Sequence, residues 1–295
     1  MTDKRLGPEE AAALVPDGAT IAVGGAMLCR QPMALLRELV REGRHGLTVQ
    51  ARVAGLGVDL LVGGGCASRV ESADQGLGSS GPAPNLRRAI EADTVQATDV
   101  TESWMIGRFE AGASGLPFYP WRPRPGSDLG DRPDIALIED PFTGDRIGAL
   151  RPAVPDVAVI HGYFADDAGN VARPASGGQY DIDVLIARAA KKVIVTVEQI
   201  VSRSEVARRP HQTYIPHDRV DAVVEAPYGA HPGGCDGFYD VDKTALTEYL
   251  RAAADPELFR AWLGSYVRRP ANHLDYLERA TTPLAIAALT TPSEA

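Results

Sequence analysis

The sequence is poor in cysteine, in basic charge and in long apolar runs, and each shortage removes a class of protein. Its three cysteines, Cys29, Cys66 and Cys235, are an odd and widely spaced set, so we expect neither a disulfide framework nor a zinc knuckle. With 39 acidic against 30 basic side chains the net charge is −9, which argues against nucleic acid as a partner. No stretch approaches the roughly 18 apolar residues of a membrane span, and no signal peptide is recognisable. A cytoplasmic protein without membrane contact is expected.

Several catalytic motifs are missing as well. The glycine turn near residue 24 does not read G-x-G-x-x-G, and no G-K-[ST] occurs, which disfavours a nucleotide cofactor. The absence of G-x-S-x-G disfavours a serine hydrolase. His211, His217 and His273 lack the spacing of metal ligands, so no metal site is expected.

Short β-branched runs alternate with helical patterns along most of the chain. This alternation predicts the α/β class, with a buried, largely parallel sheet flanked by helices. The expected strands are Thr20–Val23, Leu47–Gln50, Thr94–Ala97, Ile135–Ile138, Val157–Ile160, Val193–Val197 and Ala222–Val224. The expected helices are Met33–Arg41, Leu86–Ala92, Glu102–Ala113, Tyr180–Ala190, Thr244–Ala254, Glu257–Arg268 and His273–Arg279.

We expect one domain over residues 1–295. The proline-rich segment Pro117–Pro133 has little periodicity and predicts a long loop rather than a linker. The three helical patterns near the end predict a C-terminal helical region at about residues 244–280.

The first candidate site is the turn after the first strand, Gly24-Gly25-Ala26, with the loop that leads to Gln31 and Pro32. Paired glycines let the backbone approach a bound group, and ligands of open α/β sheets bind at such strand ends. The alternative is a turn that only reverses the chain. Arg30 is expected either to bind a carboxylate or phosphate or to be exposed without a partner.

A second glycine-rich run contains Gly76, Gly78 and Ser79. Its amides and hydroxyl groups are candidates for the lining of an acyl pocket, with Asn85 as the N-cap of the next helix. An ordinary surface loop is the alternative.

Glu102 lies where a strand gives way to a helix. It is a candidate catalytic base or water-orienting group. The alternative is a capping box, in which Asp99 caps the helix and Glu102 reaches back to the amide of Asp99. Further along, the turn Glu225–Gly234 contains His231, which either titrates near neutral pH or is a hydrogen-bonded strut.

Taken together, six segments in order resemble the A (α) subunit of family I CoA-transferases, of the glutaconate type. They are the P-M-x-L-x-R-E helix within Gly24–Glu38, APNLRRAIE at Ala83–Glu91, RFEAGASGLPFYP at Arg108–Pro120, DVAVIHGYFADDAGNV at Asp156–Val171, AKKVIVTVEQIVS at Ala190–Ser202, and VDAVVEAPYGAHPGGCDGFYD at Val220–Asp240.

The resemblance implies an α/β fold shared with NagB-like and RpiA-like isomerases and a homologous B subunit, commonly in an A2B2 assembly. The substrates would be an acyl-CoA, which brings coenzyme A, and a small carboxylic acid. In that family the nucleophilic glutamate lies in the B subunit near an S-E-N-G-like segment, and no such segment occurs here. This chain would supply a wall of the acyl pocket and, through Gly24 and Gly25, amides that stabilise an oxyanion.

Two alternatives stay open. The A (α) subunit of the CoA-dependent hydrolase of steroid-ring catabolism is similar and has a glutamate at the position of Glu102 and an arginine in the loop of Arg30. It would cleave a C–C bond of a cyclic keto acyl-CoA. A non-enzymatic sugar-phosphate sensor is the other, but no helix-turn-helix or basic face is visible.

Overall fold

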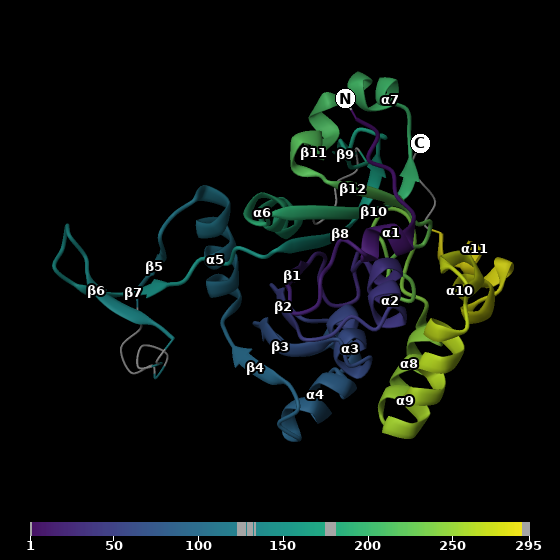
Figure 1. Cartoon of the computed structure of the whole chain (residues 1–295), viewed down its shortest axis with the longest axis horizontal. Coiled ribbons are helices and arrows are strands. Elements are labelled where there is room, and N and C mark those ends of the chain that lie inside the picture. Colours follow the sequence, from purple (N-terminus) through teal and green to yellow (C-terminus); the bar gives the residue numbers. More distant parts are fainter. Residues whose placement is uncertain (1, 123–127, 129–131, 133, 175–180, 291–295) are drawn as a thin grey trace.

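The fold is built around one large, mostly parallel sheet with helices on both sides (Figure 1). The computed structural model describes residues 2–122, 128, 132, 134–174 and 181–290. Within them the parallel strands run in the order β12-β10-β8-β1-β2-β3-β4. Their bounds are β1 (Thr20–Val23), β2 (Leu47–Ala51), β3 (Ala67–Ser72), β4 (Gln96–Asp99), β8 (Val157–Ala165), β10 (Lys192–Ile200) and β12 (Ala222–Glu225). The expected α/β class is confirmed.

The strand order reverses beside β1. From β1 the chain builds outward through β2, β3 and β4, then returns to place β8 on the other side of β1 and continues outward through β10 and β12. In open α/β sheets the crevice at such a reversal, at the carboxyl ends of the strands, is where ligands bind. The register pairs Val23 of β1 with Val159 of β8, so the turn at Gly24 opens on this crevice.

Helices cover both faces, though unequally. One core lies under the helices of the first half and the C-terminal region, and a second lies under α5 and α6. The helices are α1 (Pro8–Ala12), α2 (Met33–Arg41), α3 (Leu56–Gly63), α4 (Pro84–Glu91), α5 (Glu102–Ser114), α6 (Asp181–Ala189), α7 (Arg203–Arg208), α8 (Lys243–Ala253), α9 (Pro256–Leu263), α10 (His273–Ala280) and α11 (Pro283–Leu289). The expected helix Glu257–Arg268 is α-helical only in its first part, as α9, and continues as a π-helical turn over Gly264–Arg268. None of the helices in the described part of the chain is long and apolar enough to span a bilayer.

The half of the sheet formed by β1–β4 has one apolar and one polar face. Ile21, Val49 and Val70 point into the first core. The alternate positions carry Gln50 and Glu71, which pair across β2 and β3. The expected burial is confirmed at most positions of β1, β2 and β3, but one face of β2 and β3 is polar rather than apolar, because Gln50 and Glu71 alternate with apolar side chains.

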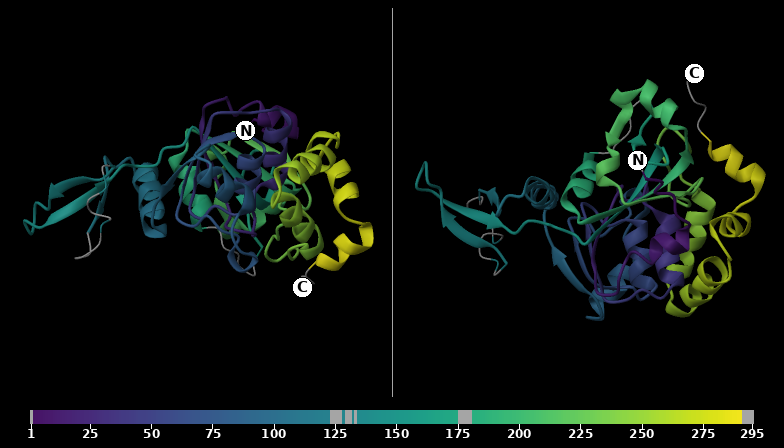
Figure 2. Two further views of the ribbon diagram at one scale, coloured as in Figure 1. Left: turned by 90° about the horizontal axis from the view of Figure 1, so that it is seen from below. Right: turned by 45° about the horizontal axis from the view of Figure 1, so that its top comes forward.

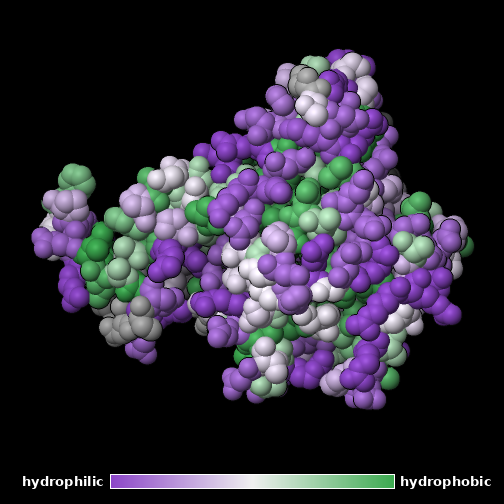
Figure 3. Space-filling view, viewed as in Figure 1, coloured by the Kyte–Doolittle hydropathy of each residue, from purple (hydrophilic) through white to green (hydrophobic). Residues whose placement is uncertain are grey.

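Three strands form a separate antiparallel sheet that projects from the body as an arm (Figure 2). They are β5 (Tyr119–Trp121), β6 (Ala136–Glu139) and β7 (Arg146–Leu150), in the order β5-β7-β6. The expected strand Ile135–Ile138 is thus confirmed as a strand but was wrongly placed in the parallel sheet. Most of the expected loop Pro117–Pro133 lies outside the described residues; its start forms β5. Hydrophobic surface is visible on the arm (Figure 3), where Phe142 is 95% exposed.

Two short strands extend the main sheet at the end of β8. They are β9 (Val171–Ala172), antiparallel to β8, and β11 (Thr213–Ile215), antiparallel to β9. Short 3-10 turns occur at Gly78–Ser80, Pro210–Gln212 and His217–Arg219. The other expected strands and helices are found within a few residues of their predicted bounds; Tyr180 lies outside the described residues.

Candidate functional site

The glycine turn after β1 is tightly enclosed. A Cβ at Gly24 would lie 2.7 Å from Asp183 Oδ1, and one at Gly25, which has a φ of +70°, would overlap the backbone at Arg30. Neither position therefore accepts a side chain without displacing its neighbours. The turn is a built feature at the strand reversal and not merely a flexible connection.

The amides of this turn are already used. Gly24 N donates to Val159 O at 2.9 Å, and Gly25 N donates to Asp183 Oδ1 at 2.9 Å. The expectation that these two amides face a thioester oxygen is therefore not met, because each has an internal acceptor. The N–H groups of Met27 and Leu28, at the half-buried tip of the turn, have no acceptor among the described residues.

Arg30 is neither exposed nor free. Its side chain is 1% exposed, and Nη1 lies 2.5 Å from Asp183 Oδ2 and donates to His161 O at 3.2 Å. Nε lies 3.1 Å from Asp236 Oδ1. Burial opposes the guanidinium charge, but Asp183, Tyr214 and Tyr163 together outweigh burial and raise the pKa of Arg30. The expectation of an exposed arginine without a partner is wrong; in this structure Arg30 braces the loop from inside.

Gln31 and Met27 join this loop to the one that follows β2. Gln31 Nε2 donates to Ala54 O at 2.5 Å, while Gln31 Oε1 accepts from Gly57 N at 2.5 Å. Met27 O accepts from Leu56 N at 3.1 Å. Gln31 is buried, so among the described residues its amide holds the loop and reaches no open surface.

The second glycine-rich run lies against the first. A Cβ at Gly78 would lie 3.0 Å from Met27 Sδ, which places the two expected loops side by side. Ser79 is exposed, and Gly76 N is held by Asp74 Oδ1 at 2.7 Å. Asn85 is not the N-cap, because α4 begins at Pro84 after Ala83; the Asn85 side chain is buried and donates to Asp59 Oδ2 at 2.9 Å.

Glu102 is the first residue of α5 and is 52% exposed. The N-cap is Thr101, whose hydroxyl accepts from Trp104 N at 3.2 Å, so the expected box with Asp99 as cap is wrong. Glu102 Oε1 lies instead 3.1 Å from Arg52 Nη1. Arg52 follows β2, and its Nε is buried without a hydrogen-bond partner among the described residues. The pair joins the loops after β2 and β4 at the carboxyl edge of the sheet.

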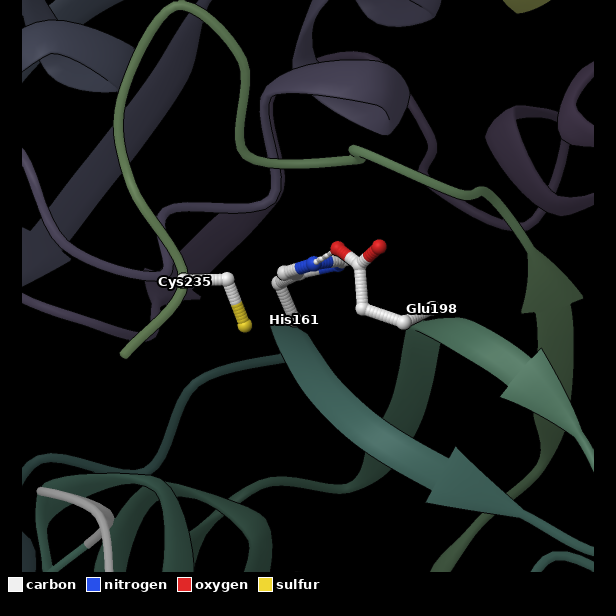
Figure 4. Close-up of side chains that lie close together, drawn as sticks. All are labelled: His161, Glu198 and Cys235. Carbon is white, nitrogen blue, oxygen red and sulfur yellow. Dashed lines mark hydrogen bonds and ion pairs between the residues drawn. The ribbon is translucent and has the colours of Figure 1, made fainter. Parts of the chain in front are cut away.

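A buried polar cluster lies beside this crevice (Figure 4). His161 on β8 and Glu198 on β10 face one another, with His161 Nε2 2.6 Å from Glu198 Oε1, and Cys235 lies close to both in the loop between β12 and α8. Glu198 also accepts from Tyr228 N, Gly229 N and Tyr239 Oη at 2.6, 3.2 and 2.8 Å. One carboxylate therefore fastens the turn after β12 to the sheet.

The donor atoms of His161, Glu198 and Cys235 lie within 4.8 Å of one another, close enough to suit a metal ion. The chemistry is less suitable. Both ring nitrogens of His161 already have partners, Glu198 and the Thr196 hydroxyl at 2.8 Å. Burial raises the pKa of Cys235, which keeps the thiol protonated. We therefore interpret the cluster as a hydrogen-bonded support for the loop.

His231 has the role of a strut. Nδ1 and Nε2 lie 2.9 Å from Tyr276 Oη and 3.2 Å from Asp242 Oδ2, and its carbonyl accepts from Arg37 Nη1 at 2.8 Å. Burial lowers the pKa of His231 from 6.5 to about 4, with Asp242 opposing and Arg37 reinforcing the shift. The ring is neutral at physiological pH.

This shift predicts a loss of stability in weak acid. Because the folded pKa is below the unfolded one, the unfolded chain takes up the proton first. The contribution of neutral His231 is complete above pH 6.5 and is lost as the pH falls through about 4. It amounts to about 3 kcal/mol in the free energy of unfolding. Urea unfolding at several pH values should give a shallower pH dependence for His231→Gln than for the unmodified chain; equal slopes would contradict the assignment.

The site includes residues that sequence reasoning did not single out. Asp183 lies far from the glycine turn in sequence, and nothing in DIDVL marks one aspartate as its acceptor. Arg52 directly follows β2, and nothing in the local sequence marks it as the partner of Glu102. His161 and Glu198 lie within otherwise apolar strands. A polar residue inside an apolar run was the only feature of the sequence that could have marked them as buried and hydrogen-bonded.

Most of the chain matches a known protein family. Residues 6–226 match the family described as Coenzyme A transferase. The chain is 35% identical to the A (α) subunit of 3-oxoadipate CoA-transferase from Pseudomonas knackmussii, over 86% of this chain and 89% of that one. It is 34% identical to the A (α) subunit of glutaconate CoA-transferase from Acidaminococcus fermentans, over 90% and 88%.

Solved structures agree. The crystal structure of glutaconate coenzyme A-transferase from Acidaminococcus fermentans superposes with a TM-score of 0.93 at 32% identity, over 98% of this chain and 96% of that chain. A single-residue variant of the decarboxylase AibA/AibB superposes with a TM-score of 0.77 at 36% identity, over 89% and 100%.

Other relatives differ in reaction or length. The cholesterol ring-cleaving hydrolase IpdA subunit of Rhodococcus jostii is 30% identical over 90% of this chain and 92% of that one. An uncharacterized protein of Archaeoglobus fulgidus is 34% identical over 94% of this chain, but the match spans only 62% of that longer protein.

Proposed function

Because this chain belongs to the coenzyme A transferase family, we propose that it is the A (α) subunit of a heteromeric CoA-transferase. The enzyme would move CoA from an acyl-CoA to a carboxylic acid, together with a homologous B subunit, in an A2B2 assembly. The observation that carries the proposal is the agreement in fold with glutaconate coenzyme A-transferase along nearly the whole chain.

In this proposal the chemistry is covalent and shared between subunits. A B-subunit carboxylate attacks the acyl-CoA carbonyl, and a mixed anhydride forms as the CoA thiolate leaves. The thiolate then attacks the B-subunit carbonyl, which gives an enzyme thioester and releases the first acid. The acceptor acid reverses the sequence and leaves as its own acyl-CoA. Covalent catalysis divides one difficult exchange into easier steps.

The present chain would build the wall of the acyl pocket. The loop Gly24–Gln31, stiffened by Arg30 and Asp183, and the run Gly76–Ser79 lie together at the sheet reversal. Since Gly24 and Gly25 have internal acceptors, the amides of Met27 and Leu28 are the better candidates to stabilise an oxyanion at the thioester. Arg52 would hold the Glu102 carboxylate at the rim.

The test uses the complex co-expressed with the B subunit of the neighbouring reading frame. Exchange of isotope-labelled acid into acyl-CoA is expected to follow ping-pong kinetics and to pass through an enzyme thioester that borohydride inactivates. Absence of exchange, together with consumption of a cyclic keto acyl-CoA by water, would contradict transfer and support a hydrolase.

The hydrolase is the second candidate because Glu102 is half exposed at the rim and is paired, rather than used as a helix cap. Glu102→Gln separates the two reactions. In a transferase the attacking carboxylate comes from the other subunit, so exchange should survive with a modest decrease. In a hydrolase that depends on Glu102, turnover should disappear, while the free energy of unfolding should fall by less than about 1 kcal/mol, the usual contribution of an exposed ion pair.

A further inference from the structure

The last helix, α11, is apolar throughout and is largely uncovered. Its residues, Pro283–Leu289, read PLAIAAL and include no polar or charged side chain. Leu284 is 83% exposed, and only Ile286 and Leu289 are half-buried. A helix that is apolar on all sides normally lies in the interior of a protein. Among the described residues, α11 therefore lacks a surface that covers it.

Both ends of α11 are held by hydrogen bonds. Thr282 caps its start with the side-chain hydroxyl. At its end, Leu289 O accepts from Asp240 N at 2.9 Å, and the Thr290 hydroxyl lies 3.1 Å from Tyr228 Oη. Leu289 also packs against the aromatic cluster of the loop after β12. The exposed apolar surface is thus part of an ordered helix with fixed ends.

The end of α11 belongs to a strip of backbone pairs that starts at the glycine turn after β1. Gly234 N donates to Leu28 O at 2.8 Å, at the tip of that turn. Cys235 N donates to Tyr239 O at 2.9 Å, and Tyr239 pairs in turn with Thr290. Because paired segments lie about 4.8 Å apart, the end of α11 is at most about 20 Å from Leu28.

A protein that covers the tip of the glycine turn can also cover α11. The proposed transferase, on which this inference rests, requires a B-subunit carboxylate to approach the crevice from outside this chain. A stable interface covers about 800 Å² on each partner, which is a patch about 30 Å across. A patch of that size extends over both Leu28 and the end of α11.

The arm also exposes apolar side chains, among them Phe142, but it lies at the opposite end of the molecule from α11 (Figure 1, Figure 2). Within the described chain its three strands pair only with one another. Of the two apolar surfaces, α11 is the one that backbone pairing joins to the glycine turn. The arm and α11 therefore belong to different contacts.

We propose that α11 is a docking surface for the B subunit, with Leu284 as its apolar anchor. The matching surface of the B subunit is an apolar groove, because α11 offers no charged or polar side chain for a polar partner to pair with. Leu284 is the most exposed leucine of the helix and contributes most of the area that such a groove would bury.

The test measures the dissociation constant of the full chain and the purified B subunit by surface plasmon resonance. Leu284→Glu is expected to raise this constant by about tenfold or more, since it removes a leucine from the interface and places a charge there. The chain should still fold, because Leu284 is exposed and a carboxylate in the first turn of a helix is favourable.

The matched control is Leu258→Glu, the same substitution at another exposed leucine in the first turn of a helix, α9. It should leave the dissociation constant within about twofold of that of the unmodified chain. Phe142→Glu tests the arm in the same assay, and a loss of binding there but not at Leu284 would overturn the proposal.

The remaining outcomes separate the docking surface from the proposed function. A complex that forms but exchanges no CoA would contradict the transferase, while the dissociation constant of Leu284→Glu would still decide the docking surface. An unchanged constant for Leu284→Glu would overturn the docking surface even if CoA is exchanged. Self-association of the lone chain that Leu284→Glu abolishes, detected by analytical ultracentrifugation, would also overturn it, because a second copy would then cover α11. Failure of the unmodified chain to bind the B subunit would overturn both proposals.

Discussion

Replacement of Arg30 by methionine is expected to lower the free energy of unfolding by about 3 to 5 kcal/mol, the penalty for an uncompensated buried charge. The side chain of Asp183 is fully buried, and Arg30 is its cationic partner. Without the guanidinium, Asp183 keeps the Gly25 amide as a hydrogen-bond donor but has lost its compensating charge. Chemical unfolding followed by circular dichroism measures the loss.

Two variants make this result specific. Arg30→Met combined with Asp183→Asn removes both charges and should be less destabilised than Arg30→Met alone. Arg87→Met removes an arginine from an exposed pair, where the effect is expected to be below about 1 kcal/mol. If the free energy of unfolding of Arg30→Met lies within about 1 kcal/mol of that of the unmodified chain, the buried ion pair between Arg30 and Asp183 does not stabilise the loop as described.

The chain purified without a B subunit is expected to transfer no CoA. Three carboxylates near the crevice are engaged in the described structure: Glu102 with Arg52, Asp183 with Arg30, and Glu198 with His161. A nucleophilic carboxylate must be able to approach a thioester carbonyl at bonding distance. Asp183 and Glu198 are buried, and Glu102 stands at the rim.

The assay compares the lone chain with the reconstituted complex at equal concentration, using acyl-CoA and an acceptor acid. Exchange should be restored when the B subunit is added and should titrate to a fixed stoichiometry. If CoA-transfer activity is found in the size-exclusion fractions that contain the chain alone, the proposed division of the active site between two subunits is wrong.

The sequence was a reliable guide where local pattern and burial agree. β1 and α2 have the predicted bounds because an apolar run and an amphipathic helix follow one another without competing signals. β3 was missed since Arg69 and Glu71 interrupt its apolar residues, which gives no continuous run. The arm was misassigned because an apolar run alone does not distinguish parallel from antiparallel pairing.

The site was predictable only in part. The sequence shows positions of special backbone geometry, such as Gly24 and Gly25. It also shows a carboxylate at the start of a helix, such as Glu102. The partners that decide what these residues do are distant in sequence. Asp183 accepts the hydrogen bond of the Gly25 amide, which the local sequence of the turn would leave without an acceptor. Arg52 forms an ion pair with Glu102 from a different loop. Both contacts depend on the order of strands, which local pattern does not encode.

The contact between Gly24 and Asp183 has an evolutionary consequence. Any side chain at position 24 would collide with the carboxylate at position 183, and that carboxylate also neutralises Arg30. Mutational drift at one of the three positions is therefore constrained by the other two. Homologous chains should inherit them as a block, and a lineage that gains alanine at position 24 should at the same time displace the Asp183 carboxylate or replace Asp183 by a smaller residue.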